Sequence, residues 1–343
     1  MPLRFEIAKL TGPRYSLRCL LFHDIADQVC GFTKGLGVTL GIKDFEATIK
    51  FISRYYTPIG LQDYLGARPK GKLPHRPILV TFDDAYASVA LNAAPILRHY
   101  KVPAVFLVNA SLIGNEELGL DNLLCYVANT SGVETVRSVA RQFAPSGEFE
   151  RASLEQVFDD LLPVMSQDGI RKFRTALSSA AGISSVDLAR RAKLYVTAEQ
   201  LRALAESGFE IGNHTFSHVF CRSLAGGDFE QEIDANKAKL ETITGSRVRA
   251  FSVPYGSPAD LTRELADNLR RFGHEVVFLA RDRSNSPGTD LYRLNRINVH
   301  AGSEQDLFGQ IEILPRLRSL ADLLFCRNTG LPKALDALHD STM

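Results

Sequence analysis

The chain has 343 residues, and its 40 Lys and Arg residues nearly balance 39 Asp and Glu residues, giving a formal charge of +1. This balance excludes a general electrostatic attraction to nucleic acid or to anionic lipid. The length allows a sizeable hydrophobic core and predicts one large domain that carries an inserted subdomain. Nothing in the composition sets an oligomeric state.

The cysteines are scattered, odd in number and without CxxC spacing: Cys19, Cys30, Cys125, Cys221 and Cys326. This pattern argues against a disulfide framework and against a zinc knuckle, so we expect reduced thiols. No apolar run approaches the roughly 18 residues that span a bilayer, and the N-terminus lacks an apolar segment after a basic start. We therefore expect a cytoplasmic protein without stable membrane insertion.

Short apolar or β-branched runs recur along the chain and are separated by helical patterns. They are Arg18–Phe22, Pro77–Phe82, Pro103–Asn109, Phe209–Gly212, Arg249–Pro254, Glu275–Leu279 and Leu294–Val299. Strands of this length that alternate with helices are typical of a parallel sheet or barrel built from βα units. Helices are predicted over Phe45–Tyr55, Ala90–Tyr100 and Thr197–Ser207, the last with a capping start at Thr197 and Gln200.

Residues 111–196 interrupt this alternation. The pattern predicts helices around Leu120–Ala128, Leu154–Met165 and Gly169–Ala181. The stretch is too long and too regular for a simple loop, so we interpret it as a helical insertion. It serves either as a lid that selects substrates or as plain packing. The expected domain is thus residues 15–310, interrupted by 111–196, with an amphipathic helical tail over 311–343.

Polar side chains follow the predicted strands at the points where they end. His23, Asp83, Asp84, Asn109, His214, Tyr255 and His300 all occupy such positions. In parallel barrels the carboxyl ends of the strands form one rim, which holds the active site. The sequence therefore predicts that these residues gather at one rim.

Asp84, His214 and His218 together offer one carboxylate and two imidazoles, the latter four residues apart. Three such ligands leave open positions for water and for a substrate oxygen on one divalent metal. The metal lowers the pKa of its water towards about 7, which favours hydrolysis at neutral pH. Asp83 cannot easily bind the same ion, because neighbouring side chains diverge along a strand, and is free to act as a general base.

Three segments carry a family resemblance: Ile78–Tyr86 with Thr81-Phe82-Asp83-Asp84, Val196–His218 with His214-Thr215-Phe216-Ser217-His218, and Phe251-Ser252-Val253-Pro254-Tyr255-Gly256. They resemble the signature motifs of polysaccharide deacetylases, carbohydrate esterase family four, also described as the chitooligosaccharide deacetylase homology domain. The resemblance covers approximately residues 18–300 without the insertion. It implies an α/β fold, a distorted (β/α) barrel of about seven strands with a helical insertion.

The resemblance also implies a reaction, the removal of an N-acetyl group from an amino sugar with one divalent metal. Zinc is the expected ion, with cobalt, nickel, iron or manganese as alternatives. By matching position, Asp83 is the base and Asp84, His214 and His218 hold the metal. By the same resemblance, Pro254, Tyr255 and Gly256 contact the substrate, and the Tyr255 backbone N–H donates a hydrogen bond to the oxyanion. Thr215 orients the histidine loop.

The departing amine needs a proton, because an amide nitrogen is otherwise a poor leaving group. Leu20-Leu21-Phe22-His23 matches the family's Leu-x-x-His motif, moved to the front of the barrel as in circularly permuted members. His300 is the competing general acid. Many relatives place an Arg where this chain has Ser252, to tether the catalytic aspartate, and Arg296 or Arg249 is the expected replacement. Ala85 stands where Gly is common, which matters if the backbone needs positive φ.

Three functions remain open at this stage. The first is a metal-dependent deacetylase, or deformylase, of an amino sugar or its lipid-linked or nucleotide-linked conjugate. The second is a metal-free cyclic amide hydrolase on the same barrel, which the retained Asp84, His214 and His218 disfavour. The third is a catalytically silent carbohydrate-binding protein, which the retained Asp83 disfavours. The absence of Trp favours a small substrate over a long polymer.

Overall fold

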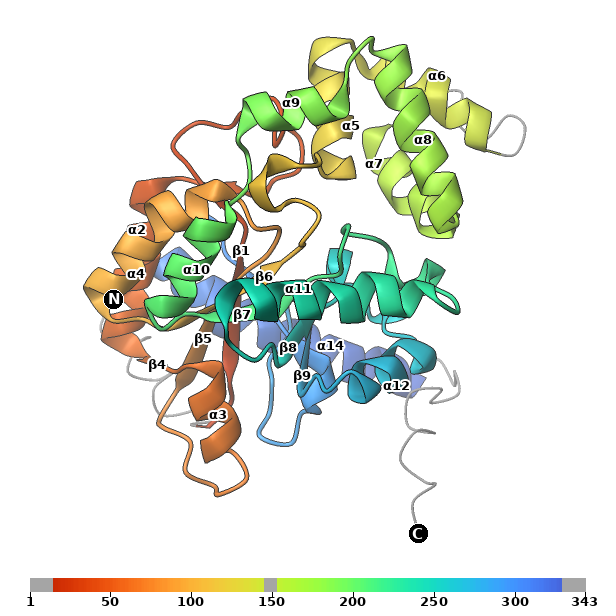
Figure 1. Cartoon of the computed structure of the whole chain (residues 1–343). Coiled ribbons are helices and arrows are strands. Elements are labelled where there is room, and N and C mark those ends of the chain that lie inside the picture. Colours follow the sequence, from red (N-terminus) through yellow and green to blue (C-terminus); the bar gives the residue numbers. More distant parts are fainter. Residues whose placement is uncertain (1–14, 145–152, 329–343) are drawn as a thin grey trace.

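The computed structural model describes residues 15–144 and 153–328 (Figure 1). Six of the predicted strands form within this part of the chain, and the seventh, Leu294–Val299, is divided at Arg296 into two short strands. The strands of the main sheet are β1 (Arg18–Phe22), β4 (Thr57–Pro58), β5 (Pro77–Phe82), β6 (Ala104–Val108), β7 (Glu210–Asn213), β8 (Ala250–Ser252), β9 (Val276–Leu279), β10 (Leu294–Asn295) and β11 (Ile297–Asn298). Most of their residues are buried, as expected for parallel strands covered on both faces.

The main sheet has the order β10-β9-β8-β7-β6-β5-β1-β11, with parallel neighbours and with β4 beside β5. Its two ends belong to one short segment, because only Arg296 separates β10 from β11. β10 pairs with β9 through Leu294 and Phe278, whereas β11 pairs with β1 through Ile297 and Leu20. The segment therefore joins both edges, and the predicted distorted barrel is confirmed.

Helices surround the barrel between its strands (Figure 1). They are α2 (Ile42–Tyr55), α3 (Leu61–Ala67), α4 (Ala94–Tyr100), α10 (Ala198–Glu206), α11 (Ala235–Thr244), α12 (Arg263–Arg271), α13 (Glu304–Phe308) and α14 (Leu314–Asn328). The start of α10 is the predicted one: the Thr197 hydroxyl accepts from the Gln200 backbone N–H, and the Gln200 side chain accepts from the Thr197 N–H. A π-helical turn, Val89–Ala93, precedes α4, so the helix expected from Ala90 is α-helical only from Ala94.

The segment predicted as an insertion is helical and stands apart from the helices that line the strands (Figure 1). It contains α5 (Leu120–Thr130), α6 (Val133–Phe143), α7 (Leu154–Gln156), α8 (Gln167–Ala180) and α9 (Ser185–Ala192). The helix expected over Leu154–Met165 is broken: α7 continues into a π-helical turn and a 3-10 turn that contains Pro163. The sequence did not predict α6 or α9. The limits at residues 111 and 196 remain a prediction.

Two further features lie outside the main sheet. A two-stranded parallel sheet, β2 (Asp24–Ile25) with β3 (Thr39–Leu40), follows directly after β1 in the chain. The loop that connects β2 to β3 extends from this small sheet. At the other end of the chain, α14 carries exposed Leu317 and Leu320 on an amphipathic surface. Residues 329–343 of the predicted tail lie outside the described residues. Across residues 15–144 and 153–328, every helix is too short or too polar to cross a bilayer.

Candidate active site

The strand ends bring the predicted polar residues to one rim. His23 follows β1, Asp83 and Asp84 follow β5, and His214 follows β7. A pocket of about 280 Å³ opens there, and its lining includes these four residues together with His218. The neighbouring walls are provided by barrel residues Leu21, Val253, Tyr255, Gly256, Ala280 and Asn298, by Leu36 and Val38 of the β2–β3 loop, and by Asp121 and Phe158 of the insertion.

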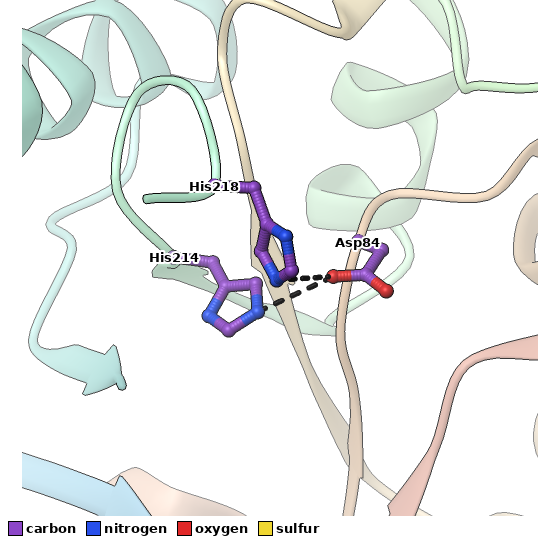
Figure 2. Close-up of side chains that lie close together, drawn as sticks. All are labelled: Asp84, His214 and His218. Atoms are coloured by element: carbon purple, nitrogen blue, oxygen red, sulfur yellow. Dashed lines mark ion pairs between the residues drawn. The ribbon is translucent and has the colours of Figure 1, made fainter. Parts of the chain in front are cut away.

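Asp84, His214 and His218 point their ligand atoms toward one another (Figure 2). Both Nε2 atoms lie 3.3 Å from Asp84 Oδ1, and the three ligand atoms lie within 4.8 Å of one another. Asp84 Oδ1 is buried and has no hydrogen-bond partner among the described residues. An unpaired buried carboxylate oxygen that faces two imidazole nitrogens is the arrangement that a divalent cation satisfies, so these residues fit a metal.

The contacts of the Nδ1 atoms explain why both histidines direct Nε2 toward Asp84. His214 Nδ1 lies 2.9 Å from the Ser252 carbonyl oxygen, and His218 Nδ1 lies 3.1 Å from Asp121 Oδ2. A carbonyl and a carboxylate oxygen accept hydrogen bonds, so Nδ1 carries a proton in both rings and Nε2 is the nitrogen left for a metal. Partners of this kind fix the tautomer and the ring orientation of metal-binding histidines.

Hydrogen bonds from buried side chains hold the histidine loop, residues 214–218, in place. Asn109 donates to the carbonyl oxygens of His214 and Thr215, and the Asn213 side chain accepts from the Thr215 backbone N–H. The Thr215 hydroxyl accepts from the Val219 N–H, and Glu232 accepts from Ser217. Thr215 and His218 have φ of 62° and 57°, a strained conformation that these contacts maintain. Thr215 and Pro254 are buried and do not line the pocket.

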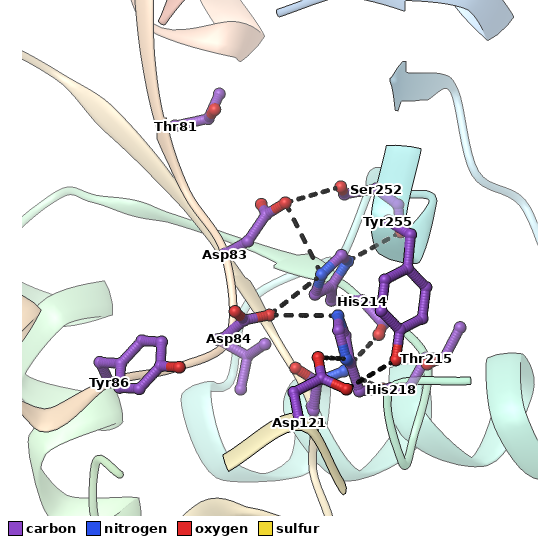
Figure 3. A network of polar contacts seen from close by, with 12 residues as sticks. Thr81, Asp83, Asp84, Tyr86, Asp121, His214, Thr215, His218, Ser252 and Tyr255 are labelled. Atoms are coloured by element: carbon purple, nitrogen blue, oxygen red, sulfur yellow. Dashed lines mark hydrogen bonds and ion pairs between the residues drawn. The ribbon is translucent and has the colours of Figure 1, made fainter. Parts of the chain in front are cut away.

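Asp83 lies beside the metal triad, with its Oδ2 3.6 Å from His214 Nε2, and is held mainly by two other residues (Figure 3). Arg296 donates to both of its carboxylate oxygens, each at 2.6 Å, and the Ser252 hydroxyl donates to Oδ2 at 3.1 Å. Burial on its own raises the pKa of Asp83, but Arg296 and then His214 outweigh burial and hold the pKa below its ordinary value. The carboxylate is therefore ionised and oriented by a fully buried, bidentate pair.

Arg296, and not Arg249, is the arginine that tethers Asp83 in this chain. Arg296 comes from the segment between β10 and β11 that closes the barrel, and so its guanidinium reaches the Ser252 hydroxyl at 2.6 Å as well as Asp83. Arg249, the other expected replacement, instead bonds Glu275. Sequence spacing did not reveal this direction, because it depends on how the barrel closes.

The remaining charges are coupled as well. Burial raises the pKa of Asp84, but His218 and His214 lower it well below its usual range. Burial lowers the pKa of His218, whereas Asp84 and Asp121 raise it to about 9. Burial also lowers the pKa of His23, against the opposing effect of Asp84 and Asp83. His300 is exposed, and its backbone N–H donates to Gln310, so the structure does not bring it to the pocket.

The third motif forms a strained turn beside the triad. Tyr255 has φ of 60° and Gly256 has φ of 67°. A Cβ on Gly256 would lie 2.2 Å from the backbone nitrogen of Ala280, so only glycine fits there. Asp84 and Ala85 also have positive φ, 69° and 56°, a conformation that favours glycine, so Ala85 adopts it at some cost.

Sequence analysis missed Asp121. This residue lies in the first turn of α5, where an acidic residue is also favoured by the helix dipole, so the sequence signal was indistinguishable from an ordinary helix start. In the structure it contacts His218 and accepts a hydrogen bond from the Tyr255 hydroxyl at 2.8 Å (Figure 3).

Sequence comparison identifies a curated relative. A poly-beta-1,6-N-acetyl-D-glucosamine N-deacetylase of Staphylococcus aureus is 34% identical over 73 residues, which is 21% of this chain and 25% of the relative. The chain thus matches about a quarter of that curated relative's length.

Solved structures show the same fold. The Streptococcus pyogenes deacetylase PplD in complex with acetate superposes with a TM-score of 0.58 at 14% identity, covering 87% of this chain and 99% of that one. IcaB from Ammonifex degensii superposes with a TM-score of 0.55 at 18% identity, covering 87% and 97%. The model of the polysaccharide deacetylase family matches residues 70–276. Because that match spans more than half of the chain, this protein belongs to the polysaccharide deacetylase family.

Proposed function

We propose that this protein is a metal-dependent hydrolase that removes an N-acetyl group, or an N-formyl group, from an amino-sugar substrate. The observation that carries the proposal is the triad of Asp84, His214 and His218, whose ligand atoms converge on a buried carboxylate oxygen without a hydrogen-bond partner among the described residues. Asp83, ionised and held by Arg296, lines the same pocket. When bound, a divalent ion such as zinc supplies Lewis acidity that polarises the amide carbonyl and acidifies water.

The protein's own groups then have distinct tasks. Asp83 accepts a proton from the water that attacks the carbonyl carbon, and the Tyr255 backbone N–H stabilises the resulting oxyanion, a contribution of roughly 3 kcal/mol per donor. As the C–N bond breaks, His23 donates a proton to the departing nitrogen. The products are acetate, or formate, and a free amino sugar.

The pocket size supports a small or terminal sugar unit as the part of the substrate that enters. A volume of about 280 Å³ lies just below the range of about 300–1,000 Å³ that is typical of small-molecule sites. Leu36, Val38 and Phe158 offer apolar walls, and Tyr255 offers an aromatic one. The S. aureus relative, a poly-beta-1,6-N-acetyl-D-glucosamine N-deacetylase, supports an N-acetylated amino sugar as the substrate class.

The test of the proposal is acetate release from a panel of short N-acetylated sugars, with formylated analogues beside them. The metal-free protein, prepared with a chelator, should be inactive and should recover when Zn²⁺ is returned. Activity that is unchanged in the metal-free protein would favour the metal-free amide hydrolase. Stoichiometric metal binding without hydrolysis of any member would favour a silent carbohydrate-binding protein.

Asp83→Asn separates the base from the ligands. The variant keeps the shape of the side chain and should retain metal, while its turnover falls by about 10²- to 10⁴-fold, the usual effect of losing general acid–base catalysis. Metal content and turnover are measured on the same sample. Loss of metal in proportion to activity would assign Asp83 to the metal instead.

His23→Ala tests the general acid. The variant should suppress cleavage of an amide much more than cleavage of an activated ester, because the ester's leaving group needs no proton. His300→Ala is the matched control and should affect neither substrate. Equal losses on both substrates in His23→Ala, or a selective loss in His300→Ala, would refute the assignment.

A further inference from the structure

The insertion reaches into the metal site through one helix, α5. Asp121, in its first turn, uses both carboxylate oxygens there: Oδ2 lies 3.1 Å from His218 Nδ1, and Oδ1 accepts from the Tyr255 hydroxyl at 2.8 Å. The Tyr255 ring also packs 4.8 Å from the His218 ring and stacks on Phe220 at 3.7 Å. Asp121 thus fixes the second histidine of the triad and the third motif together (Figure 3).

The next residue fixes the other side of the site. Asn122 donates to the Tyr86 hydroxyl at 2.9 Å and to the Phe32 carbonyl at 3.0 Å, and it accepts from the Tyr195 hydroxyl. Tyr86 lies two residues after Asp84, on the loop that carries the metal-binding carboxylate. Two consecutive residues of α5 therefore contact both metal-bearing loops, which come from different strands.

These contacts are more than packing between two surfaces. The Asp121 side chain is only 15% exposed, and His218 is 11% exposed, so a carboxylate placed there is costly unless its partners need it. A packing role would be served by apolar side chains, whereas this carboxylate accepts from the ring nitrogen opposite the one that faces Asp84. Carboxylate partners of this kind raise the basicity of a metal-binding imidazole and fix its orientation.

We propose that Asp121 is a positioning residue for the metal centre, supplied by the insertion, and that it holds His218 with Nε2 facing Asp84. This inference rests on the proposed metal-dependent function. It assigns the insertion a task beyond the expected lid or packing role, since the triad is correctly oriented only when α5 is docked. Excising residues 111–196 would accordingly weaken metal binding as well as alter the pocket.

The experiment compares Asp121→Ala with Asn129→Ala on the same helix. Asn129 ties α5 to the carbonyl oxygens of Gly31 and Lys34 but does not line the pocket, so its loss reports general loosening of the insertion. The dissociation constant for Zn²⁺ is measured by chelator competition on metal-free proteins, with circular dichroism as a check on folding. Asp121→Ala should bind Zn²⁺ about 10- to 100-fold more weakly, and Asn129→Ala within about twofold of wild type.

Co²⁺ provides a spectroscopic readout, because its visible absorption reports the geometry of the ligands. The spectrum should change in Asp121→Ala and stay unchanged in Asn129→Ala. Asp121→Asn, which keeps an acceptor oxygen of the same shape, should recover part of the affinity, even if the alanine variant folds poorly.

The outcomes separate the two proposals. Wild-type affinity and spectrum in both Asp121 variants would overturn the positioning role while leaving the metal centre intact. An equal loss in Asn129→Ala would also overturn it, since the effect would then be loosening of the insertion. A wild-type protein that binds no Zn²⁺ would overturn the proposed function itself, and the role of Asp121 with it.

Discussion

The barrel carries a buried cluster of charges at each end, and the two clusters differ in whether they open on a pocket. At the end where the strands begin, Glu312 receives Arg18 at 3.0 Å, Arg76 at 3.1 Å and also Arg316. At the rim where the strands end, Asp84 shares one oxygen between two histidines, and that oxygen has no hydrogen-bond partner among the described residues. Both clusters are largely buried, with side-chain exposure of 2% for Glu312 and 16% for Asp84. Each also contains a buried atom without a hydrogen-bond partner among the described residues, Arg76 Nη1 and Asp84 Oδ1, so neither feature alone marks a site.

The difference lies in what each cluster leaves available. Glu312 joins the segment before α14 to β1 and to the residue before β5, and none of the pockets described includes it. The rim cluster opens on a pocket and leaves imidazole lone pairs directed at a common point. A charge cluster that none of these pockets reaches contributes to the stability of the fold. A cluster that directs a carboxylate oxygen and two imidazole nitrogens into a pocket has the capacity for a ligand.

The largest expected effect breaks the rim cluster. His214→Ala removes one of three protein ligands and should weaken Zn²⁺ binding by more than the 10- to 100-fold typical of losing an outer partner. Turnover should fall with metal occupancy. Metal analysis of the purified variant checks this, with exposed His300→Ala as the control for histidine loss. Unchanged occupancy in His214→Ala would show that the metal lies elsewhere.

Glu312→Gln should break the cluster at the other end of the barrel, lowering the stability of the fold and leaving Zn²⁺ binding unchanged. The variant leaves two buried guanidinium groups without their carboxylate, a change that typically costs about 3–5 kcal/mol of unfolding free energy. Urea denaturation measures the loss, and Glu230→Gln, which breaks an exposed pair with Arg271, should leave the free energy of unfolding nearly unchanged. Zn²⁺ affinity should stay at the wild-type value in Glu312→Gln. A large loss of affinity would mean that the two ends are coupled.

The pH dependence of this stability difference follows from the sign of the shift. Burial raises the pKa of Glu312, but Arg18, with the other arginines, outweighs burial and holds the pKa below the ordinary 4.5. A lowered folded-state pKa gives stabilisation that is fully present above 4.5 and is lost as the pH falls. The difference between wild type and Glu312→Gln should therefore be constant near neutral pH and shrink below about pH 4.5. A difference that grows on acidification would contradict this.

The sequence predicted the strand ends but not the cross-barrel contacts. Asp83, Asp84 and His214 follow apolar runs directly, and period and spacing identify such positions. Arg296 could be proposed as a partner for Asp83, yet its direction depends on the closure between β9 and β1. Asp121 could not be found, because its contact with His218 depends on how the insertion docks. The same limit applies to Glu312, whose buried partners Arg18 and Arg76 lie 294 and 236 positions away in the sequence.

The smallest expected effect concerns Ser252, within the rim cluster. Its hydroxyl donates to Asp83 Oδ2 and accepts from Arg296 Nη2 at 2.6 Å, so Ser252→Ala removes two hydrogen bonds from a buried network. Arg296 still holds both carboxylate oxygens, and the orientation of Asp83 should survive. We expect a stability loss of about 1 kcal/mol and less than a tenfold fall in turnover.

Arg296→Lys is the matched comparison for that small effect. A lysine ammonium cannot reproduce the planar fork that contacts both oxygens, so this variant should lower turnover more than Ser252→Ala does, with metal occupancy retained in both. Steady-state kinetics on one substrate and urea denaturation of both variants provide the measurement. If Ser252→Ala loses as much turnover as Arg296→Lys, then the serine hydroxyl sets the orientation of the base. Ser252 would then orient Asp83 in this chain, and Arg296 would mainly supply the charge that keeps Asp83 ionised.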